Sequence, residues 1–494
     1  MKGPFGPYLS RCRGAMGLLS NTKWVALSQG FKVAVQLLNI VVLARLIPPG
    51  EYGLMAMALV VTNFAILVRD LGTAAAIIQR QDLEEKTINA IFWLNVAMGL
   101  VIAVTVIASS PVISYLFHES RLIFILCLLS ISFPLASTSS AHLALLEKRS
   151  RFREIAFIEI SSSATAVTIA IVLAYMNWGV YSLVMQSIIM ALMSTIQLWL
   201  KSDWRPTTKK IFDWHEIKNL LGFSGNLTLF NFINYFSRNA DSMIIGHYLS
   251  SAVLGAYSLA YRIMLFPVQN MTFVASRALF PIFSEHQKDN EKLRESYYST
   301  LQFILLIVLP LMTGLAVLSE PFVNLVFGEK WHLTASILTW LAPTGIIQAV
   351  LSTSGTVFMA KGRTDVLMKL GIVGMILQVS AFVLGVNFGI LNFAKFYFIA
   401  NLINFVPVMW SVMRMIDGKL FEFFKRIYNL IIATLLMVAF MKLILLNVPY
   451  FYVVNSFVKL VVISLLGGGG YLFYVFVTER EISISLKSLF KNIP

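Results

Sequence analysis

The sequence is dominated by fourteen apolar runs that are each long enough to cross a lipid bilayer. A membrane-spanning helix needs about 20 apolar residues, because each residue rises about 1.5 Å and the hydrocarbon core is roughly 30 Å thick. The runs therefore predict an all-α polytopic membrane protein with about fourteen transmembrane helices. The expected spans are residues 23–47, 52–70, 87–110, 122–144, 155–176, 179–200, 219–247, 252–282, 300–327, 333–359, 365–388, 392–413, 427–446 and 453–477.

The composition supports this class and excludes several others. Hydrophobic residues make up 58% of the chain and charged residues 13%, whereas soluble domains average about 45–50% and about 25%. The net charge is +15, but most positive charges lie in short loops between apolar runs. We therefore attribute the charge to membrane topology and expect no nucleic-acid partner. Cys12 and Cys127 are far apart and are expected to be unpaired, so they indicate neither a disulfide framework nor a metal site.

The distribution of lysine and arginine predicts the orientation of the spans. With a cytoplasmic N-terminus, 28 of the 39 lysines and arginines fall in inner segments, and only Arg121, Lys330 and Lys395 fall in outer loops. Cytoplasmic loops are enriched in these residues, and an odd error in the number of spans would have scrambled the alternation. The pattern predicts fourteen helices with both termini in the cytoplasm.

The lengths of the connections predict the division of the chain. Outer connections are short, whereas the longest inner connection separates helices 1–6 from helices 7–12. The first residues lack the compact apolar core and cleavage site of a signal peptide, so we interpret them as a tail. The expected parts are a cytoplasmic tail at 1–22, an N-terminal six-helix bundle at 23–200, a cytoplasmic linker at 201–218, a C-terminal six-helix bundle at 219–414, two extra helices at 427–478 and a cytoplasmic tail at 479–494.

A weak internal repeat relates the two bundles. Three identities appear when the second half is shifted back by 202 positions: Gly255 falls on Gly53, Ala260 on Ala58 and Phe266 on Phe64. Both stretches contain a long apolar run, a short glycine-containing turn and another long apolar run. Repeated halves with ionisable residues at matched membrane depth suggest a transporter.

Polar residues form stripes on the helices that carry this repeat. At about 100° per residue, one stripe on run 219–247 lies within an arc of about 80°; it consists of Asn231, Asn234, Arg238 and Asp241. A similar stripe on run 23–47 consists of Ser28, Lys32, Gln36 and Asn39. The same shift places Lys32 on Asn234, Gln36 on Arg238 and Asn39 on Asp241. Run 252–282 adds Ser258, Arg262 and Gln269 along one side.

A charge at the centre of a bilayer costs on the order of 2.5–3.5 kcal/mol, so we expect the stripes to face a shared, water-accessible cavity. The excess of cations favours an anionic substrate, and arginine suits bidentate contact with phosphate. The predicted substrate-binding residues are Lys32, Gln36, Asn39, Asn234, Arg238, Asp241, Arg262 and Gln269.

Other interpretations of these charges stay open. Arg238 and Asp241 could form a structural ion pair while Lys32 snorkels to the surface. That interpretation leaves Arg262 unexplained, because no acidic residue lies within a turn of it. Asp241 alone could instead be a site for a coupling ion or a proton.

Motifs of soluble enzymes are missing from the sequence. No glycine loop followed by Lys and Ser or Thr could cradle phosphates, no HExxH stretch occurs, and the six histidines are scattered. We therefore expect a transporter without catalytic residues, metal site or bound cofactor.

Several stretches resemble a known family. In the first half they are ARLIPPGEYGLMAMALVV, RDLGTAAAIIQR and INAIFWLN, and in the second half NADSMIIGHYLSSAVLGAYSLAYRI, ALFPIFS and VFGEKWHLTASILTWLAP. Together they are similar to the polysaccharide-transporter (Wzx-type) flippases of the multidrug/oligosaccharidyl-lipid/polysaccharide (MOP) superfamily. The resemblance covers roughly residues 20–415.

The resemblance implies two pseudo-symmetric six-helix bundles in a V around a cavity that opens alternately to each side, plus two extra C-terminal helices. The implied substrate is an undecaprenyl-diphosphate-linked oligosaccharide repeat unit, moved across the bacterial inner membrane for O-antigen, exopolysaccharide or capsule synthesis. The implied partners are this substrate, membrane lipids, and a polymerase and co-polymerase of the same pathway. Coupling to H⁺ or Na⁺ is the usual expectation. Lys32, Arg238 and Arg262 match the cavity cations that meet the diphosphate.

Two alternative functions compete with this prediction. A drug/cation antiporter on the same fold would have an acidic cavity, but few acidic residues lie within the spans. A membrane-embedded polysaccharide-processing enzyme would need a catalytic cluster on a sizeable loop, and the outer loops are short. The sequence favours the flippase over both.

Overall fold

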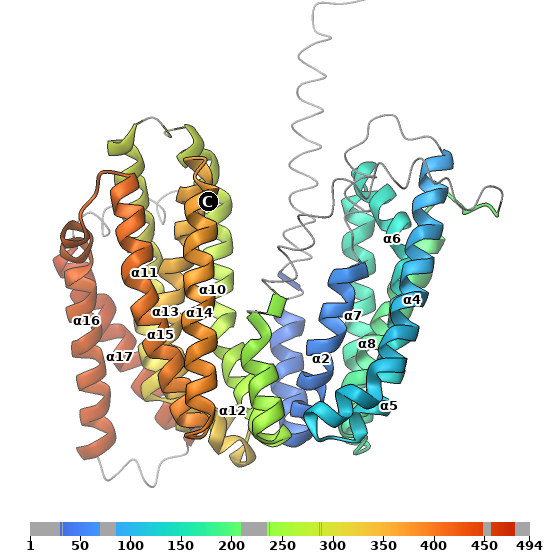
Figure 1. The fold of residues 1–494 in the computed structure, drawn as a ribbon. Coiled ribbons are helices and arrows are strands. Elements are labelled where there is room, and N and C mark those ends of the chain that lie inside the picture. The colour runs from blue at the N-terminus through green and yellow to red at the C-terminus, as the bar shows by residue number, and fades with distance from the viewer. Residues whose placement is uncertain are drawn as a thin grey trace, which may run out of the picture. The chain divides into compact units, whose positions relative to one another are not determined.

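A computed structural model describes residues 30–31, 33–69, 85–208, 235–236, 238–285, 287, 289–447 and 456–479. All regular elements in these ranges are helices (Figure 1). Twelve of the helices are long and apolar enough to cross a membrane, which confirms the predicted all-α polytopic class. The exact count of fourteen is not confirmed, because the remaining predicted spans, 23–47 and 219–247, fall partly outside the described ranges.

Contacts within the chain group it into two compact units, Met1–Gly255 and Ala256–Pro494. The first unit contains a shorter apolar helix at Val33–Leu46, α2 (Pro49–Arg69), α4 (Glu85–Phe117), α5 (Arg121–Ser130), α6 (Ser132–Lys148), α7 (Phe152–Tyr175), α8 (Val180–Lys201), a helical segment at 238–248 and the first turn of α10 (Ser251–Glu285). The domain boundaries expected from the sequence stay predictions.

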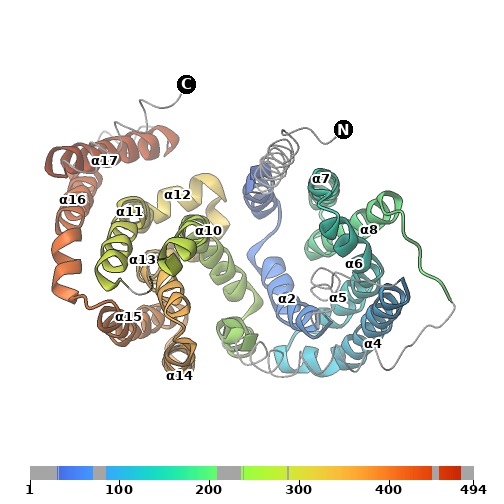
Figure 2. The same cartoon turned by 90° about the horizontal axis from the view of Figure 1, so that it is seen from above.

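The second unit contains the rest of α10 and the helices that follow it. These are α11 (Asn290–Val317), α12 (Ser319–Val326), a short 3-10 turn η1 (Glu329–Trp331), α13 (His332–Ala360), α14 (Thr364–Val386), α15 (Ile390–Met415), α16 (Leu420–Asn447) and α17 (Ser456–Thr478). Seen from above, α16 and α17 lie beside α11 at the edge of this unit (Figure 2).

Two predicted spans are interrupted in the structure. The sequence predicts one helix over run 300–327, but α11 ends at Val317 and α12 begins at Ser319. Pro321 explains the break, because proline is tolerated in the first turn of a helix and disrupts a helix interior. Run 122–144 contains both α5 and α6, which meet at Ile131 and together still form one candidate span.

Many large apolar side chains point outward along these helices. Leu446, Phe473 and Leu465 are 82%, 73% and 69% exposed in the isolated chain. Such residues would be costly on a water-soluble surface, whereas lipid tails are as apolar as the side chains themselves. The outward faces therefore fit a bilayer.

The start of α2 and the start of α10 meet in a reciprocal contact. A Cβ atom placed on Gly53 would lie 1.7 Å from the carbonyl oxygen of Ser251, and one placed on Gly255 would lie 1.9 Å from the carbonyl oxygen of Pro49. Pro49 and Ser251, the first residues of α2 and α10, are also related by the shift of 202. The repeat seen in the sequence thus places each glycine against the first residue of the repeated helix, where only a hydrogen fits.

We expect Gly53→Ala and Gly255→Ala each to destabilise the protein by roughly 1–3 kcal/mol, because the new methyl group would force two backbones apart. The thermal unfolding midpoint of the purified protein in detergent measures this effect. Gly314→Ala is the matched control, since a Cβ on Gly314 of α11 meets nothing within 4 Å and alanine favours a helix by about 1 kcal/mol. An unchanged midpoint for both crossing variants would contradict the proposed packing constraint.

Candidate functional site

The first predicted polar stripe lies on the helix at Val33–Leu46. Gln36 is exposed and Asn39 is half-buried, one turn apart. The Oδ1 atom of Asn39 is buried and has no hydrogen-bond partner in the part of the chain that the structure describes. A buried acceptor without a donor costs about 1–3 kcal/mol, which makes Asn39 a candidate for contact with a bound group. Lys32 and Asn234 lie outside the described residues.

Arg238 and Asp241 belong to the helical segment at 238–248, but they have different environments. Arg238 is exposed, whereas Asp241 is only 6% exposed. The Asp241 Oδ1 atom accepts a hydrogen bond from the backbone N–H of Ser242 at 2.6 Å. Among the ion pairs between described residues, none joins Arg238 to Asp241. The structural ion pair considered from the sequence is therefore not formed.

Arg262 and Gln269 share one face of α10 in the second unit. They are seven residues apart, which is about two helical turns, and both are exposed. Met264 and Val268 lie on the opposite side of the helix and are buried. Arg262 also takes part in no ion pair between described residues. The face of α10 that carries the predicted site residues is therefore an exposed face.

A carboxylate that the sequence analysis did not single out organises one end of the first unit. Arg121, at the start of α5, donates to both oxygens of Glu51 at 2.6 and 2.8 Å. The backbone N–H of Val180, the first residue of α8, also donates to Glu51 Oε2 at 2.8 Å. Gly179 has φ +56°, and a Cβ on it would lie 2.7 Å from that oxygen. Glu51 therefore joins α2, α5 and α8 in one polar contact.

The role of Glu51 follows from these partners. Its side chain is 18% exposed, and its oxygens accept from a guanidinium and from the N-terminus of a helix, where negative charge is favourable. A carboxylate with this set of donors is positioned to hold helix ends together. The sequence offered one signal, a lone acidic residue in the PPGEY connection, but nothing linked it to Arg121, 70 positions away.

The described start of the predicted linker is attached to the first unit. Thr207 donates its N–H to Asn89 at 2.8 Å and accepts from the indole of Trp93 at 2.9 Å. Trp204 packs against His142 with ring centroids 5.4 Å apart. His142 is fully buried among aromatic rings. This part of the linker covers one end of the bundle.

Comparison with known proteins places the chain in a family. The family described as "Polysaccharide biosynthesis protein" matches residues 42–336. The chain is 31% identical over 373 residues to the lipopolysaccharide biosynthesis protein WzxC of Escherichia coli (strain K12), covering 74% of this chain and 75% of that protein. The chain belongs to the polysaccharide biosynthesis protein family. This membership confirms the resemblance to Wzx-type proteins and the predicted class of a membrane transporter.

Two other known proteins are similar to most of this chain. It is 28% identical over 428 residues to the teichuronic acid biosynthesis protein TuaB of Bacillus subtilis (strain 168), covering 86% of the chain and 88% of that protein. The solved structure of the lipid II flippase MurJ in an inward closed conformation has a TM-score of 0.71 at 16% identity. That match covers 92% of this chain and 99% of the other. At this identity it shows a shared fold.

We expect Arg121→Ala to destabilise the protein by roughly 1–2 kcal/mol, because Glu51 would lose two of its three hydrogen bonds while staying largely buried. The loss is moderate, since the Arg121 side chain is 45% exposed and water screens it. Thermal unfolding measures it. In the control Arg149→Ala, the lost partner Asp203 is 73% exposed, so the effect should stay below about 1 kcal/mol. Equal effects would refute the special role of Glu51.

Proposed function

We propose that this protein is a flippase that moves lipid-linked oligosaccharide repeat units, carried on undecaprenyl diphosphate, across a membrane. The proposal is supported by membership in the polysaccharide biosynthesis protein family and by relatives named for lipopolysaccharide and teichuronic acid biosynthesis. The observation that carries it is the exposure of two arginines on helices, Arg262 on a part of α10 that is apolar enough to span a membrane and Arg238 on the helical segment at 238–248.

The physical argument concerns the cost of these two charges. An arginine in contact with lipid tails near the middle of a bilayer costs several kcal/mol on insertion scales. Neither Arg238 nor Arg262 offsets this cost through an ion pair with another described residue. A diphosphate group would offset it, because each guanidinium can donate two parallel hydrogen bonds to phosphate oxygens. Lys32 would be a third cation that binds the diphosphate.

The polar residues without charge fit the sugar portion of such a substrate. Gln36, Asn39 and Gln269 carry amides that can donate to hydroxyl groups and accept from them. We propose that these residues meet the oligosaccharide while the polyprenyl chain stays in lipid. No covalent bond changes in this process, and the protein alternates between states open to opposite sides.

Direction of transport requires a difference in affinity between the two states. A ligand shifts an equilibrium only by as much as its affinity differs between the states. We propose that H⁺ or Na⁺ supplies part of this difference at Asp241, the single acidic residue in the predicted site. Its burial supports this role, because an ionised carboxylate in a dry environment gains from a proton or a cation.

The proposed location is a bacterial inner membrane, with both termini in the cytoplasm. The support for this orientation is the concentration of lysine and arginine in alternate connections. Polysaccharide polymerase and co-polymerase are the proposed pathway partners, since a translocated repeat unit must be consumed by a chain-extending enzyme.

We expect Arg238→Ala and Arg262→Ala each to lower the flipping rate about tenfold or more, because each loses a charge-assisted contact of about 1.5–3 kcal/mol. Arg→Lys at the same positions should retain part of the rate, since the charge stays and the bidentate geometry is lost. Lys395→Ala is the matched control; its ammonium lies 5.3 Å from the ring of Trp340, outside the predicted site. The measurement is flipping of a lipid-linked oligosaccharide in proteoliposomes that contain equal amounts of each variant.

Normal flipping by both alanine variants would exclude diphosphate recognition by these arginines, while the family assignment would stand. Wild-type protein that moves an organic cation against a proton gradient, and moves no lipid-linked oligosaccharide, would support the antiporter alternative. Asp241→Asn tests the coupling proposal separately. It should abolish the dependence of the rate on an imposed H⁺ or Na⁺ gradient and leave movement without a gradient intact.

A further inference from the structure

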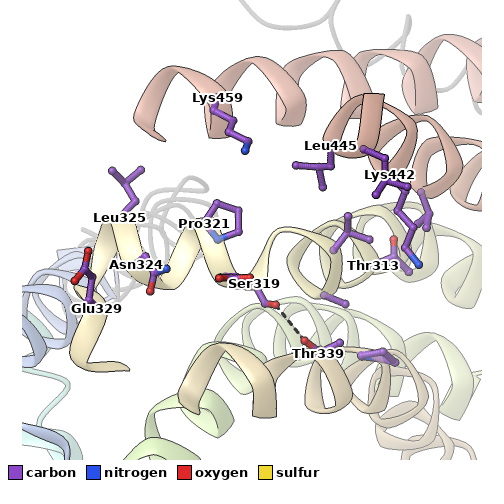
Figure 3. Close-up of a pocket in the computed structure, with 16 residues that line it drawn as sticks. Thr313, Ser319, Pro321, Asn324, Leu325, Glu329, Thr339, Lys442, Leu445 and Lys459 are labelled. Carbon is purple, nitrogen blue, oxygen red and sulfur yellow. Dashed lines mark hydrogen bonds between the residues drawn. The ribbon is translucent and has the colours of Figure 1, made fainter. Parts of the chain in front are cut away.

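A second candidate binding site lies within the second unit, and none of the predicted transport residues lines it. A cavity of about 1230 Å³ opens where α11, α12 and α13 face α16 and α17 (Figure 3). It lies at the ends of these helices: α11 ends at Val317, α13 begins at His332, α16 ends at Asn447 and α17 begins at Ser456. Ends of membrane-spanning helices lie at the level of the lipid headgroups. The cavity is therefore at a membrane interface.

The packing of α16 and α17 differs between the two ends of the bundle. Toward the other end of the bundle, the Tyr471 hydroxyl donates to the carbonyl of Leu306 at 3.0 Å. Glu479, just beyond α17, accepts from Gln302 at 3.3 Å and from Asn429 at 3.0 Å. These contacts close α17 onto α11 and α16. At the cavity end, the short helix α12 turns aside after Leu318 and space remains between it and α17.

The side chains that line the cavity combine two charge signs with apolar walls. Lys442 of α16 and Lys459 of α17 contribute ammonium groups, and Figure 3 shows Lys459 extending from α17 toward α12. Glu320 and Glu329, on the α12 side, are exposed and contribute carboxylates. Val438, Leu445 and Leu446 are among the apolar residues of the wall. The cavity therefore offers cations on one side, anions on the other and hydrocarbon between them.

We propose that this cavity binds a membrane phospholipid with a zwitterionic phosphate–ammonium headgroup, of the phosphatidylethanolamine class. Its phosphate would accept hydrogen bonds from Lys442 and Lys459, and its ammonium group would donate to Glu320 and Glu329. Its acyl chains would follow the apolar wall into the bilayer. The cavity exceeds the roughly 300–1,000 Å³ of a typical small-ligand site, as expected for a headgroup with the first part of two acyl chains.

Two observations favour a zwitterionic headgroup over a purely anionic one. The two carboxylates balance the two ammonium groups, so an anionic headgroup without a donor would leave Glu320 and Glu329 without a partner in the ligand. In addition, Asn324 lines the cavity, and its Oδ1 atom is buried with no hydrogen-bond partner among the described residues. Rotation of that amide toward the cavity would let the oxygen accept from an ammonium group.

The bound lipid would fill the gap between α12 and α17 and so hold the two extra helices on the bundle. This role concerns a resident lipid and not the transported substrate, so it does not depend on the function proposed above. A lipid that binds only the folded state stabilises it by mass action.

Native mass spectrometry of the full-length protein, extracted from membranes in mild detergent, tests the proposal. We expect one retained phospholipid per chain, and the double variant Lys442→Met, Lys459→Met should reduce its occupancy about tenfold or more, as expected for the loss of a charge-assisted hydrogen bond. Methionine keeps the length and the apolar contacts of the lysine stem. Lys369→Met is the matched control, because Lys369 is also an exposed lysine within a span, near the start of α14.

A second measurement covers the case in which the double variant does not fold. Phosphatidylethanolamine added to delipidated wild-type protein should raise the thermal unfolding midpoint more than phosphatidylglycerol does, and diacylglycerol, which lacks the phosphate, should have no effect. Equal stabilisation by all three lipids would overturn the proposal, as would undiminished lipid occupancy in a folded double variant. A retained polyprenyl phosphate in place of a phospholipid would assign the cavity to the substrate and also overturn it.

Discussion

The backbone contact between α2 and α10 is the constraint on which the first unit depends. Gly53 and Gly255 each approach the carbonyl of the residue that begins the other helix, and both helices begin at positions related by the same shift. Lipid supplies little hydrophobic force to hold helices together, so close backbone packing carries much of the association. Glu51 lies two residues before Gly53 and fixes the same end of α2 to α5 and α8. The short stretch from Glu51 to Gly53 thus holds the start of α2 against α5, α8 and the start of α10.

The sequence predicted the helices well because its main signal, the length of apolar runs, is set by bilayer thickness. It aligned Gly53 with Gly255 through the repeat, whereas the close contact that each glycine makes is seen only in the structure. It missed the break between α11 and α12, where the apolar run continues through Leu318 and only the short Ser319–Pro321 stretch marks the interruption. It also missed the Glu51–Arg121 contact, because a single pair of loop charges has no periodicity, and its partner is chosen by the packing of α2 against α5.

The candidate transport residues show how far helical periodicity predicts the environment of a side chain. A periodicity of 100° per residue places Arg262 and Gln269 on one face of α10, and both are exposed in the structure. The same periodicity grouped Arg238 with Asp241, yet one is exposed and the other buried. A 60° difference around a helix is enough to move a side chain from a free surface to a packed one. Periodicity predicts the face of a residue, whereas its ionic partner depends on rotamers and on neighbouring helices.

Two groups of cations, the arginines of the predicted site and the lysines of the cavity, both need a partner that offsets the cost of a charge in lipid. Arg238 and Arg262 lie on helix faces without described ionic partners, so the cost of their placement must be offset by something outside the described bundle. Lys442 and Lys459 also lie in apolar helices, but they are close to the helix ends, and two carboxylates line the same cavity. Depth therefore separates their roles. A deep cation needs a ligand that enters the protein, whereas a cation at the interface can be satisfied by the headgroup of a lipid that is always present.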